Sequence, residues 1–547
     1  MNSDCFKNLS MGEKIVNKDK SERFRFFPII LICVLLITYF IYLFFAFAQV
    51  PMDSDFASLV LEANDILSGN IFLNGWYLTG ATFILSEIPF YLIGSAIFDI
   101  SVKSYILAAS LMTWFMIISA CLLSLSSKKK LWLQILIFFA IAGFPGLYLL
   151  KSSRAHGGIF IINFALLICI QYLFRNTSVS KSSVWIVYFL LITFGIASDL
   201  FILPILVVPV IFYCAAILLS NRDNLRKFHS KLLGITVVAV IAGKIIEKLY
   251  LSHGAILNNR INNSYNVSHF ANFEDLPKNF MVYLQILLKL FDCDITDTLI
   301  FSPQSVLIFL RFIIIFFGFW TVFKSIRDFF SQKKYDLVNL LISLGIVSLS
   351  IWLIISRFLE DINCGRYYAY FPAAFAVLII RYLNEKDVFS KRIAMYRIPA
   401  TIPIAVISTV LIAGSIQPVK TTRVPTPQDR LATFLKDNNL TEGYSDFWNA
   451  NHVVVAAKNK VQIRAIFISK KDNGSKAYPY YWFSKSEWYK NPNANFVVIK
   501  TQGDYAGYHN VKTENVLQYF GEPLQKLEFE DYMIFVYPKG ISEKIVP

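Results

Sequence analysis

The chain has 547 residues, of which 56% are hydrophobic, and its mean hydropathy is +0.52. This composition excludes an ordinary soluble protein and indicates a polytopic membrane protein with a polar tail. The formal net charge of +15 does not indicate nucleic-acid binding, because the basic residues lie in short loops and the polar parts carry no basic stripe with interleaved aromatics. We therefore expect membrane lipids, and no nucleic acid, as partners.

The first apolar segment, residues 28–49, is long enough to cross a bilayer core, which takes about 20 helical residues. Residues 1–27 carry several Lys and Arg residues and few acids, so we expect this tail to be cytoplasmic. The apolar segment is too long for a cleaved signal peptide and should remain as an anchor. It leads into an outer loop, residues 50–103, which opens with PMDSDFASL and places Asp53 and Asp55 outside.

Residues 79–100 are apolar and have two possible placements. If they cross the membrane, residues 104–125 return outward and the lysine run 128–130 lies outside, against the tendency of basic loops to stay in the cytoplasm. Glu87 and Pro89 also make this segment a poor span. We therefore place residues 79–100 in the outer interface and expect residues 104–125 to cross inward.

With this register about eleven segments cross the membrane, and every basic loop is cytoplasmic. The expected crossings are residues 28–49, 104–125, 131–149, 159–173, 184–196, 201–219, 232–250, 306–323, 337–355, 367–380 and 398–416. Residues 280–291 are predicted to form a further interfacial helix.

The outer tail, residues 418–547, changes character and predicts a small α/β domain. Residues 428–436 are helix-like, whereas VVVAAK, FVVIK and MIFVYP are short β-rich runs bounded by Gly, Pro and Asn. The aromatic segment 478–489, YPYYWFSKSEWY, has two interpretations. It either contacts the membrane or a glycan, or it packs as a hydrophobic loop.

Asp53 and Asp55 stand at the start of a predicted amphipathic helix that lies on the membrane surface and stops near Gly69. Asp53 also has two interpretations. It is either a helix N-cap, which the free amides and the helix dipole favour, or a general base that takes a proton from a hydroxyl attacking a lipid-bound donor.

Several cations are expected on the same outer side, where they can bind a phosphate. Arg154 and His156 lie in the loop KSSRAHGG, and Arg366 begins a span. Arg311 lies inside a span, where an arginine is costly unless it faces a cavity or a partner. Arg366 has the alternative of snorkelling to the interface. Arginine suits phosphate because its planar group gives bidentate hydrogen bonds, so these residues predict a base and a phosphate clamp facing one cavity.

Three other groups carry weaker predictions. The acidic run FDCDITDT, residues 291–298, either holds a hard cation or is an exposed loop. Cys293 and Cys364 form a disulfide if they lie close together in an oxidising compartment. Asp199, in IASDLF, either lines the cavity or caps the following helix.

The chain resembles the C-type glycosyltransferase (GT-C) fold. A short basic tail, one span and an outer loop that opens with acidic residues and carries two juxtamembrane helices are typical of this fold. The stretches DSDFASLVLEANDILSGN, NGWYLTG and IPFYLIGSAIFDIS are similar to family segments, as are RYYAYFPAAF and GYSDFWNANHVVVAAKNKVQIRAI in the late chain. Phe56 stands where many relatives have a second acidic residue, which leaves Asp53 or Asp55 open as the base. We favour Asp55 by position.

The resemblance implies a mainly α polytopic membrane domain, residues 28–417, with an α/β domain outside the inner membrane of a bacterium. It implies an inverting hexosyltransferase that moves a sugar from a polyprenyl-phosphate donor to an envelope glycan, such as the O-antigen of lipopolysaccharide, or to a lipid. Asp55 would be the base. The expected donor-phosphate ligands are Arg366, Arg154, Arg311 and His156. The residues expected to shape the acceptor side are Glu87, Tyr367 and Asp199.

These residues require no metal, because arginine can neutralise charge, although a divalent cation at Asp53 and Asp55 is an alternative. Two other functions are open. A lipid-linked oligosaccharide polymerase or ligase would also use outer arginines, but it does not need an acidic first loop. A transporter or flippase is less favoured, because the sequence has no internal repeat and most charges crowd the outer edge.

Overall fold

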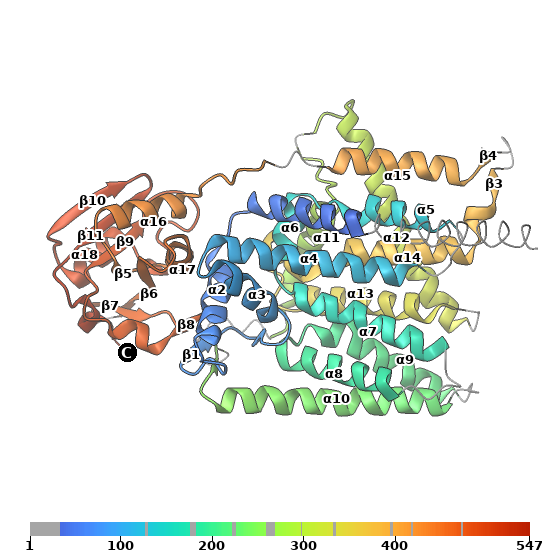
Figure 1. Ribbon diagram of the computed structural model, residues 1–547, viewed down its shortest axis with the longest axis horizontal. Coiled ribbons are helices and arrows are strands. Elements are labelled where there is room, and N and C mark those ends of the chain that lie inside the picture. The colour runs from blue at the N-terminus through green and yellow to red at the C-terminus, as the bar shows by residue number, and fades with distance from the viewer. Residues whose placement is uncertain are drawn as a thin grey trace, which may run out of the picture.

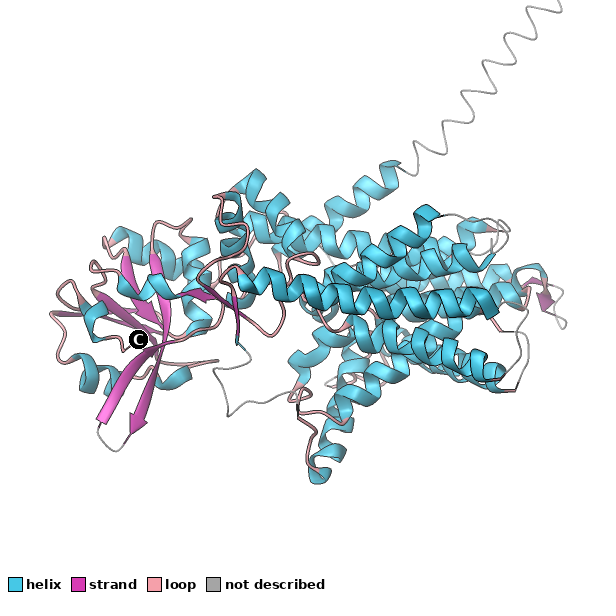
Figure 2. Cartoon of the chain, turned by 90° about the horizontal axis from the view of Figure 1, so that it is seen from below, coloured by secondary structure: helices cyan, strands magenta, loops and turns pink. Residues whose placement is uncertain are grey.

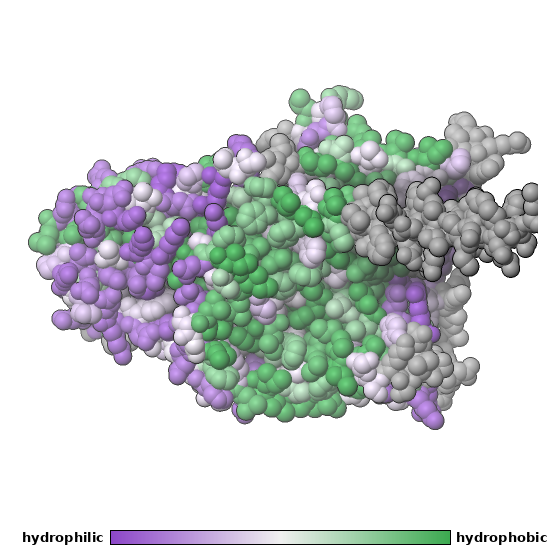
Figure 3. Space-filling model, viewed as in Figure 1, coloured by the Kyte–Doolittle hydropathy of each residue, from purple (hydrophilic) through white to green (hydrophobic). Residues whose placement is uncertain are grey.

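A bundle of long helices carries a smaller domain with a β-sheet at one end (Figure 1). This computed structural model describes residues 33–125, 130–175, 182–220, 226–258, 269–296, 298–331, 335–393, 398–416, 420–471 and 474–546. The expectations for residues 1–27, Lys128, Lys129 and Asp297 concern residues outside these ranges. Figure 3 shows hydrophobic residues over the bundle and hydrophilic residues over the tail domain. This distribution is that of a multi-pass membrane protein.

Four described helices are long and apolar enough to cross a membrane: α4 (Val102–Ser124), α7 (Gly157–Arg175), α12 (Pro303–Phe330) and α13 (Leu337–Ile354). Other bundle helices are shorter or more polar: Cys33–Ala48, α8 (Ser182–Ser198), α9 (Val208–Leu219), α10 (Arg226–Ser252), α14 (Phe371–Glu385) and α15 (Thr401–Ser415). The helical regions expected from the sequence are therefore present, but the number of crossings stays a prediction.

The segment expected to cross at residues 131–149 is broken. The helix α5 (Leu131–Phe138) continues to Gly143 and is then bent by 86° from α6 (Leu147–Ser153). Pro145 interrupts the helix because it has no amide hydrogen to donate. Gly146 meets Asp292 so closely that a Cβ there would lie 1.9 Å from a carboxylate oxygen. The bend directs α6 toward the loop that carries Arg154.

The loop that follows the first described helix contains α2 (Ser54–Leu67), β1 (Trp76–Leu78) and α3 (Ile88–Phe98). With 11 residues, α3 is too short to cross a bilayer, as expected for a segment in the interface. Figure 1 shows α2 lying across the end of the bundle, between the bundle and the tail domain. Its polar side is covered, because Ser58 and Glu62 are fully buried and Asn451 of the tail domain donates to Ser58 Oγ at 2.7 Å.

The tail domain is built on a six-stranded mixed sheet, whose strands Figure 2 shows gathered at one end of the molecule. Their order is β10 (Gln525–Phe529), β11 (Tyr532–Val536), β9 (Phe496–Lys500), β5 (Glu442–Ser445), β6 (Gln462–Lys471) and β7 (Gly474–Pro479). The helices that pack with the sheet are α16 (Pro427–Asp437), α17 (Phe447–Ala456) and α18 (Thr513–Phe520). The α/β domain expected from the sequence is present.

One predicted strand of this domain is wrong. The run VVVAAK begins inside α17, which starts after Asp446. The Asp446 carboxylate caps the helix by accepting a hydrogen bond from the amide of Trp448 at 2.9 Å. Val453, Val454 and Val455 are fully buried. Helix capping and burial against the sheet and α2 therefore outweigh the β preference of the valines.

The aromatic segment 478–489 joins the tail domain to the bundle. Its strand β8 (Ser484–Lys485) pairs with β1, which also pairs with β2 (Ile256–Leu257). The ring of Tyr481 stacks on Tyr77 at 4.0 Å, and Lys485 Nζ lies 3.2 Å from an Asp65 carboxylate oxygen. Tyr481, Ser484 and Lys485 of this segment therefore pack against the loop 50–103.

Arg381 holds together the end of the bundle that lies away from the tail domain. Its guanidinium donates to Asp336 Oδ2 at 2.6 Å, to Gln171 Oε1 at 2.7 Å and to the carbonyl of Leu123 at 3.0 Å. These contacts link α14 to α13, α7 and α4. The side chain of Arg381 is only 3% exposed, so the arginine depends on these partners for charge compensation.

We expect Arg381→Met to lower the free energy of unfolding by about 3 kcal/mol, because it leaves Asp336 without its buried partner. Chemical unfolding of the purified protein in detergent measures this change. The matched control is Lys386→Met, which removes an exposed ion pair with Glu385 and should cost under about 1 kcal/mol. Equal effects of the two substitutions would contradict a structural role for Arg381.

Candidate active site

Asp55 lies in the first turn of α2, between a cation and an indole. Its Oδ2 is 3.7 Å from Arg366 Nη1, and its Oδ1 accepts a hydrogen bond from Trp482 Nε1 at 3.3 Å. Burial raises the pKa of Asp55 to about 6, the charge of Asp53 adds to this effect, and Arg366 acts against it. The side chain is still 22% exposed. Asp55 is therefore an accessible carboxylate with an increased affinity for a proton.

Asp53 is engaged in holding the loop in place. As the N-cap of α2, its carboxylate accepts from the amide of Phe56, and it also pairs with Arg154 Nη2 at 2.7 Å. Arg154 is 2% exposed and donates further to the carbonyls of Lys151 and Pro51 and to the Tyr105 hydroxyl. The Phe56 ring lies 4.3 Å from its guanidinium. Both side chains are thus occupied by protein groups.

Arg366, one of the expected phosphate ligands, keeps free hydrogen-bonding capacity. It lies in the short helical segment Ile362–Tyr368, just before α14. Its Nη2 donates to the Tyr367 hydroxyl at 3.2 Å, whereas its buried Nε has no hydrogen-bond partner among the described residues. The side chain is 41% exposed. A phosphate oxygen can therefore reach this guanidinium.

His156, in the loop 154–158, and Asp199 form a second group of expected site residues. His156 has a positive φ of 56°, and its Nδ1 lies 2.5 Å from Asp199 Oδ2. The His156 ring also contacts Tyr367, at 5.3 Å. Asp199 additionally accepts a hydrogen bond from the amide of Phe201 at 3.0 Å. Its carboxylate therefore binds both the following turn and His156.

Glu87 is buried next to this group. Its Oε1 accepts from the amide of Gly158 at 3.2 Å, and the Ser86 hydroxyl donates to its other oxygen. A Cβ at position 158 would lie 2.2 Å from the Ser86 carbonyl oxygen, which explains the glycine. Burial, and secondly the charge of Asp199, raise the pKa of Glu87. Glu87 is placed to hold the loop 154–158 rather than to meet substrate.

Arg311 belongs to a different set of contacts. It donates to the carbonyl of Asp292 and to Ser415 Oγ, each at 2.9 Å, and Asp292 Oδ2 is 3.6 Å from its Nη2. None of its contacts in the described part of the chain is with Asp55 or Arg366. Arg311 is therefore held by Asp292 and Ser415.

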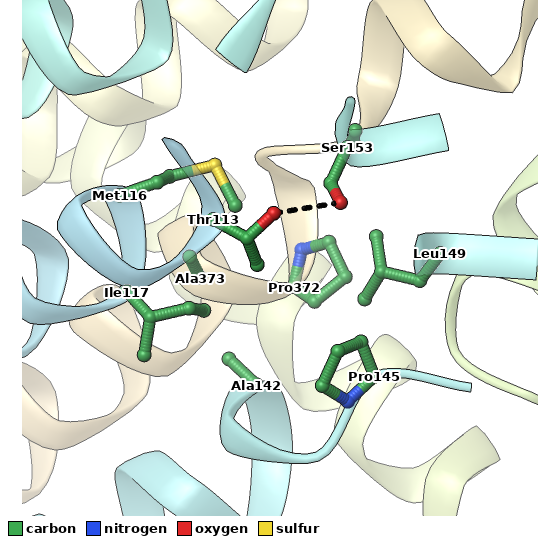
Figure 4. A pocket seen from close by; sticks show the side chains of 10 residues that line it. Thr113, Met116, Ile117, Ala142, Pro145, Leu149, Ser153, Pro372 and Ala373 are labelled. Carbon is green, nitrogen blue, oxygen red and sulfur yellow. Dashed lines mark hydrogen bonds between the residues drawn. The ribbon is translucent and has the colours of Figure 1, made fainter. Parts of the chain in front are cut away.

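The acidic run and the cysteines do not form the expected centres within the described residues. Asp294 pairs with Lys289, and no group of three or more His, Cys, Asp or Glu residues there is arranged to hold a metal. Cys293 and Cys364 are free, buried thiols, so the disulfide considered from the sequence is not formed. A small cavity within the bundle (Figure 4) is lined only by uncharged residues, among them Thr113 and Ser153, whose hydroxyls are 3.1 Å apart.

Trp482 contacts Asp55, and the sequence did not identify it as a candidate site residue. The segment 478–489 is recognisably aromatic, but the hydrogen bond to Asp55 joins residues 427 positions apart. The pairing of β8 with β1 and the contact of Asn451 with Ser58 bring the two segments together. Because strand pairing over such a separation depends on the fold, no local pattern signals it.

Two crystal structures of ArnT from Cupriavidus metallidurans have a similar fold. The apo structure has a TM-score of 0.54 at 9% sequence identity, over 95% of this chain and 99% of ArnT. The structure bound to undecaprenyl phosphate has a TM-score of 0.51 at the same identity and coverage. No protein-family model and no curated protein matches the chain. The likeness confirms the overall fold expected from the sequence.

We expect Asp55→Asn to stabilise the protein near neutral pH. A carboxyl group whose pKa is higher in the folded chain lowers stability once the pH exceeds its unfolded value of about 4. With a folded pKa of about 6, the substitution should raise the free energy of unfolding by about 3 kcal/mol at pH 7.5. The gain should fall below about 1 kcal/mol at pH 4, where the folded carboxyl is protonated and the unfolded one is about half ionised.

Unfolding of wild type and variant in detergent, at pH 4 and at pH 7.5, measures this difference. Trp482→Phe is the companion variant, because it removes the indole hydrogen bond to Asp55 and leaves the carboxylate in place. A difference between Asp55→Asn and wild type that is the same at both pH values would mean that Asp55 has no raised pKa.

Proposed function

We propose that the chain is a glycosyltransferase that moves a sugar from a polyprenyl-phosphate donor to an envelope glycan or lipid. The observation that carries this proposal is the Asp55–Arg366 pair, a partly exposed carboxylate and a partly exposed guanidinium 3.7 Å apart. The pair lies where the bundle meets the tail domain. The similar fold of ArnT, which was crystallised with undecaprenyl phosphate, supports a lipid-phosphate donor.

In the proposed reaction, Asp55 accepts the proton of an acceptor hydroxyl as its oxygen attacks the anomeric carbon of the donor sugar. A bond forms between that oxygen and the anomeric carbon, and the bond from the carbon to the phosphate oxygen breaks on the opposite face. Polyprenyl phosphate leaves as an anion, and the configuration at the carbon inverts. Arg366 stabilises the negative charge that develops on the phosphate.

The position of Arg366 links donor binding to the strength of the base. The charge of Arg366 lowers the pKa of Asp55. When a donor phosphate takes up that charge, the opposing influence weakens and Asp55 becomes a stronger base. The 3.7 Å separation is longer than a hydrogen bond, so the guanidinium can turn to the phosphate without breaking a close contact.

In this proposal Arg154 and His156 do not bind the phosphate but position the residues around it. Arg154 has its donors taken by Asp53 and neighbouring oxygens, and His156 pairs with Asp199. Both therefore position the loops around Arg366. The proposal uses arginine rather than a divalent ion for charge neutralisation, so transfer should persist in EDTA. We propose that the site lies on the outer face of a bacterial inner membrane. In the most specific form of the proposal, the transferred sugar is a hexose and the acceptor resembles an O-antigen.

We expect Asp55→Asn to lower the rate of transfer by about 10²- to 10⁴-fold, the usual contribution of a general base. Transfer of radiolabelled sugar from polyprenyl-phosphate donors to host envelope extract measures it. The matched control is Asp99→Asn, in the same loop 50–103, whose side chain is exposed and which should keep most activity. Full activity in Asp55→Asn would refute the role of this carboxylate.

We also expect activity to fall as the pH drops through about 6, because protonated Asp55 cannot accept a proton. In Arg366→Gln the inflection of kcat/KM should move to higher pH, since the charge that lowers the pKa of Asp55 is gone. Arg366→Lys keeps the charge and should keep the inflection near that of wild type. Profiles of kcat/KM between pH 5 and 9 measure this, and an unmoved inflection in Arg366→Gln would contradict the coupling.

A further inference from the structure

The tail domain carries a group of aromatic rings beside Asp55, which we call the aromatic cluster. Its members come from the start of α17, the end of β7 and the loop before α18, and they are Phe447, Trp448, Tyr480, Tyr505, Tyr508 and His509. Trp448 stacks on Tyr505 at 4.6 Å, and the His509 ring lies 3.9 Å from Tyr508 and 4.0 Å from Tyr480. The rings thus form one continuous set of contacts.

The cluster adjoins the carboxylates of the site. Tyr480 is two residues from Trp482, whose indole binds Asp55. Burial first, and then negative charges that include those of Asp53 and Asp55, raise the pKa of Tyr505. The charge of Asp55 also adds to the raised pKa of Tyr480. Rings from two different segments are therefore within electrostatic range of the proposed base.

Two polar atoms in the cluster lack partners among the described residues. Trp448 Nε1 and His509 Nδ1 are both buried and make no hydrogen bond there. Leaving such groups unpaired costs free energy, and burial lowers the pKa of His509 to about 4, so its ring is neutral. An indole N–H and a neutral imidazole can hydrogen-bond to a ligand hydroxyl.

The loop that presents the cluster is conformationally strained. Tyr505 and His509 have φ values of 65° and 55°, in the left-handed region that residues other than glycine uncommonly adopt. Such backbone is kept where surrounding contacts over-determine it, often at ligand-binding segments. Tyr505 is nevertheless 47% exposed, so its ring is held in place without being covered.

The chemistry of this surface fits a neutral sugar ring. A pyranose has apolar C–H faces that lie flat on aromatic rings, and its rim of hydroxyls meets N–H and imidazole groups. A phosphate or other anion would be repelled by the nearby carboxylates of Asp53, Asp55 and Asp504, whose charges reach Tyr505. A purely lipidic ligand would leave the two polar atoms unsatisfied.

We propose that the aromatic cluster is the acceptor subsite and that the acceptor presents a carbohydrate ring there, with a hydroxyl directed at Asp55. The proposal rests on the proposed function for the identity of the ligand as acceptor, whereas carbohydrate binding by the cluster stands independently. The donor would then approach Arg366 from the membrane and the acceptor would approach Asp55 from the tail domain.

The test is a tryptophan-fluorescence titration of the purified full chain in detergent. The probe is a fraction of oligosaccharides released by mild acid from the envelope of the host. We expect Tyr505→Ala to weaken binding about five- to tenfold, in line with the contribution of an aromatic contact, and Tyr505→Phe to retain it. The matched control is Tyr478→Ala, which removes a ring from another stacked pair of the domain, with Phe467 at 5.3 Å.

Oligosaccharide binding that is weakened in Tyr505→Ala and kept in Tyr505→Phe and Tyr478→Ala supports the subsite. Absence of binding to wild type, or equal binding by all variants, overturns it. In the transfer assay, Tyr505→Ala should raise the KM for the acceptor while leaving the KM for the donor unchanged. If Asp55→Asn transfers normally while Tyr505→Ala still loses oligosaccharide binding, the proposed function fails and the carbohydrate site stands.

Discussion

The buried ion pair between Asp53 and Arg154 is the interaction on which the rest of the site depends. An arginine that is 2% exposed must be fully paired, because an uncompensated buried charge is strongly destabilising. Its partners fix the start of α2, the chain at Pro51 and the Tyr105 hydroxyl on α4 in one arrangement. Side chains two positions apart on a helix do not face each other. Once Asp53 turns toward Arg154, Asp55 is directed toward Arg366 and Trp482.

The tail domain completes this arrangement. It covers the polar side of α2 through Asn451 and Ser58, adds a strand beside β1 and brings an indole to Asp55. Each of these contacts joins segments that are far apart in the chain. The bundle supplies Arg366 and the tail domain supplies much of the wall around Asp55, so the site belongs to the junction rather than to either part.

Local patterns predicted the elements well where a single segment determines them. The helix at 428–436 and the strands FVVIK and MIFVYP are present, because their periodicity and boundaries are local properties. Predictions were less accurate for segments whose structure depends on contacts with residues distant in the sequence. The valines of VVVAAK lie in α17 because Asp446 caps that helix, and the crossing expected at 131–149 bends because Pro145 and the contact of Gly146 with Asp292 interrupt it.

The same limit applies to the site residues. The sequence predicted that Asp53, Asp55 and several arginines lie on the outer side of the membrane. Their charges alone did not show which role each residue has. The distinction lies in what surrounds each side chain. Arg154 is surrounded by oxygens and a ring, whereas Arg366 keeps an unpaired Nε. Pairings between helices that are distant in sequence decide this, and they leave no signature in either segment.

Asp53 and Asp55 are neighbouring carboxylates with opposite effects on the stability of the fold. Asp53 stabilises the fold through its cap and its ion pair. Asp55 is raised in pKa by burial and by the charge of Asp53 itself, so its ionised form is destabilising at neutral pH. That loss of stability is what makes the carboxylate a stronger base. Because the tail domain contributes to the burial of Asp55, its docking on α2 sets the proton affinity of the group proposed to perform the chemistry.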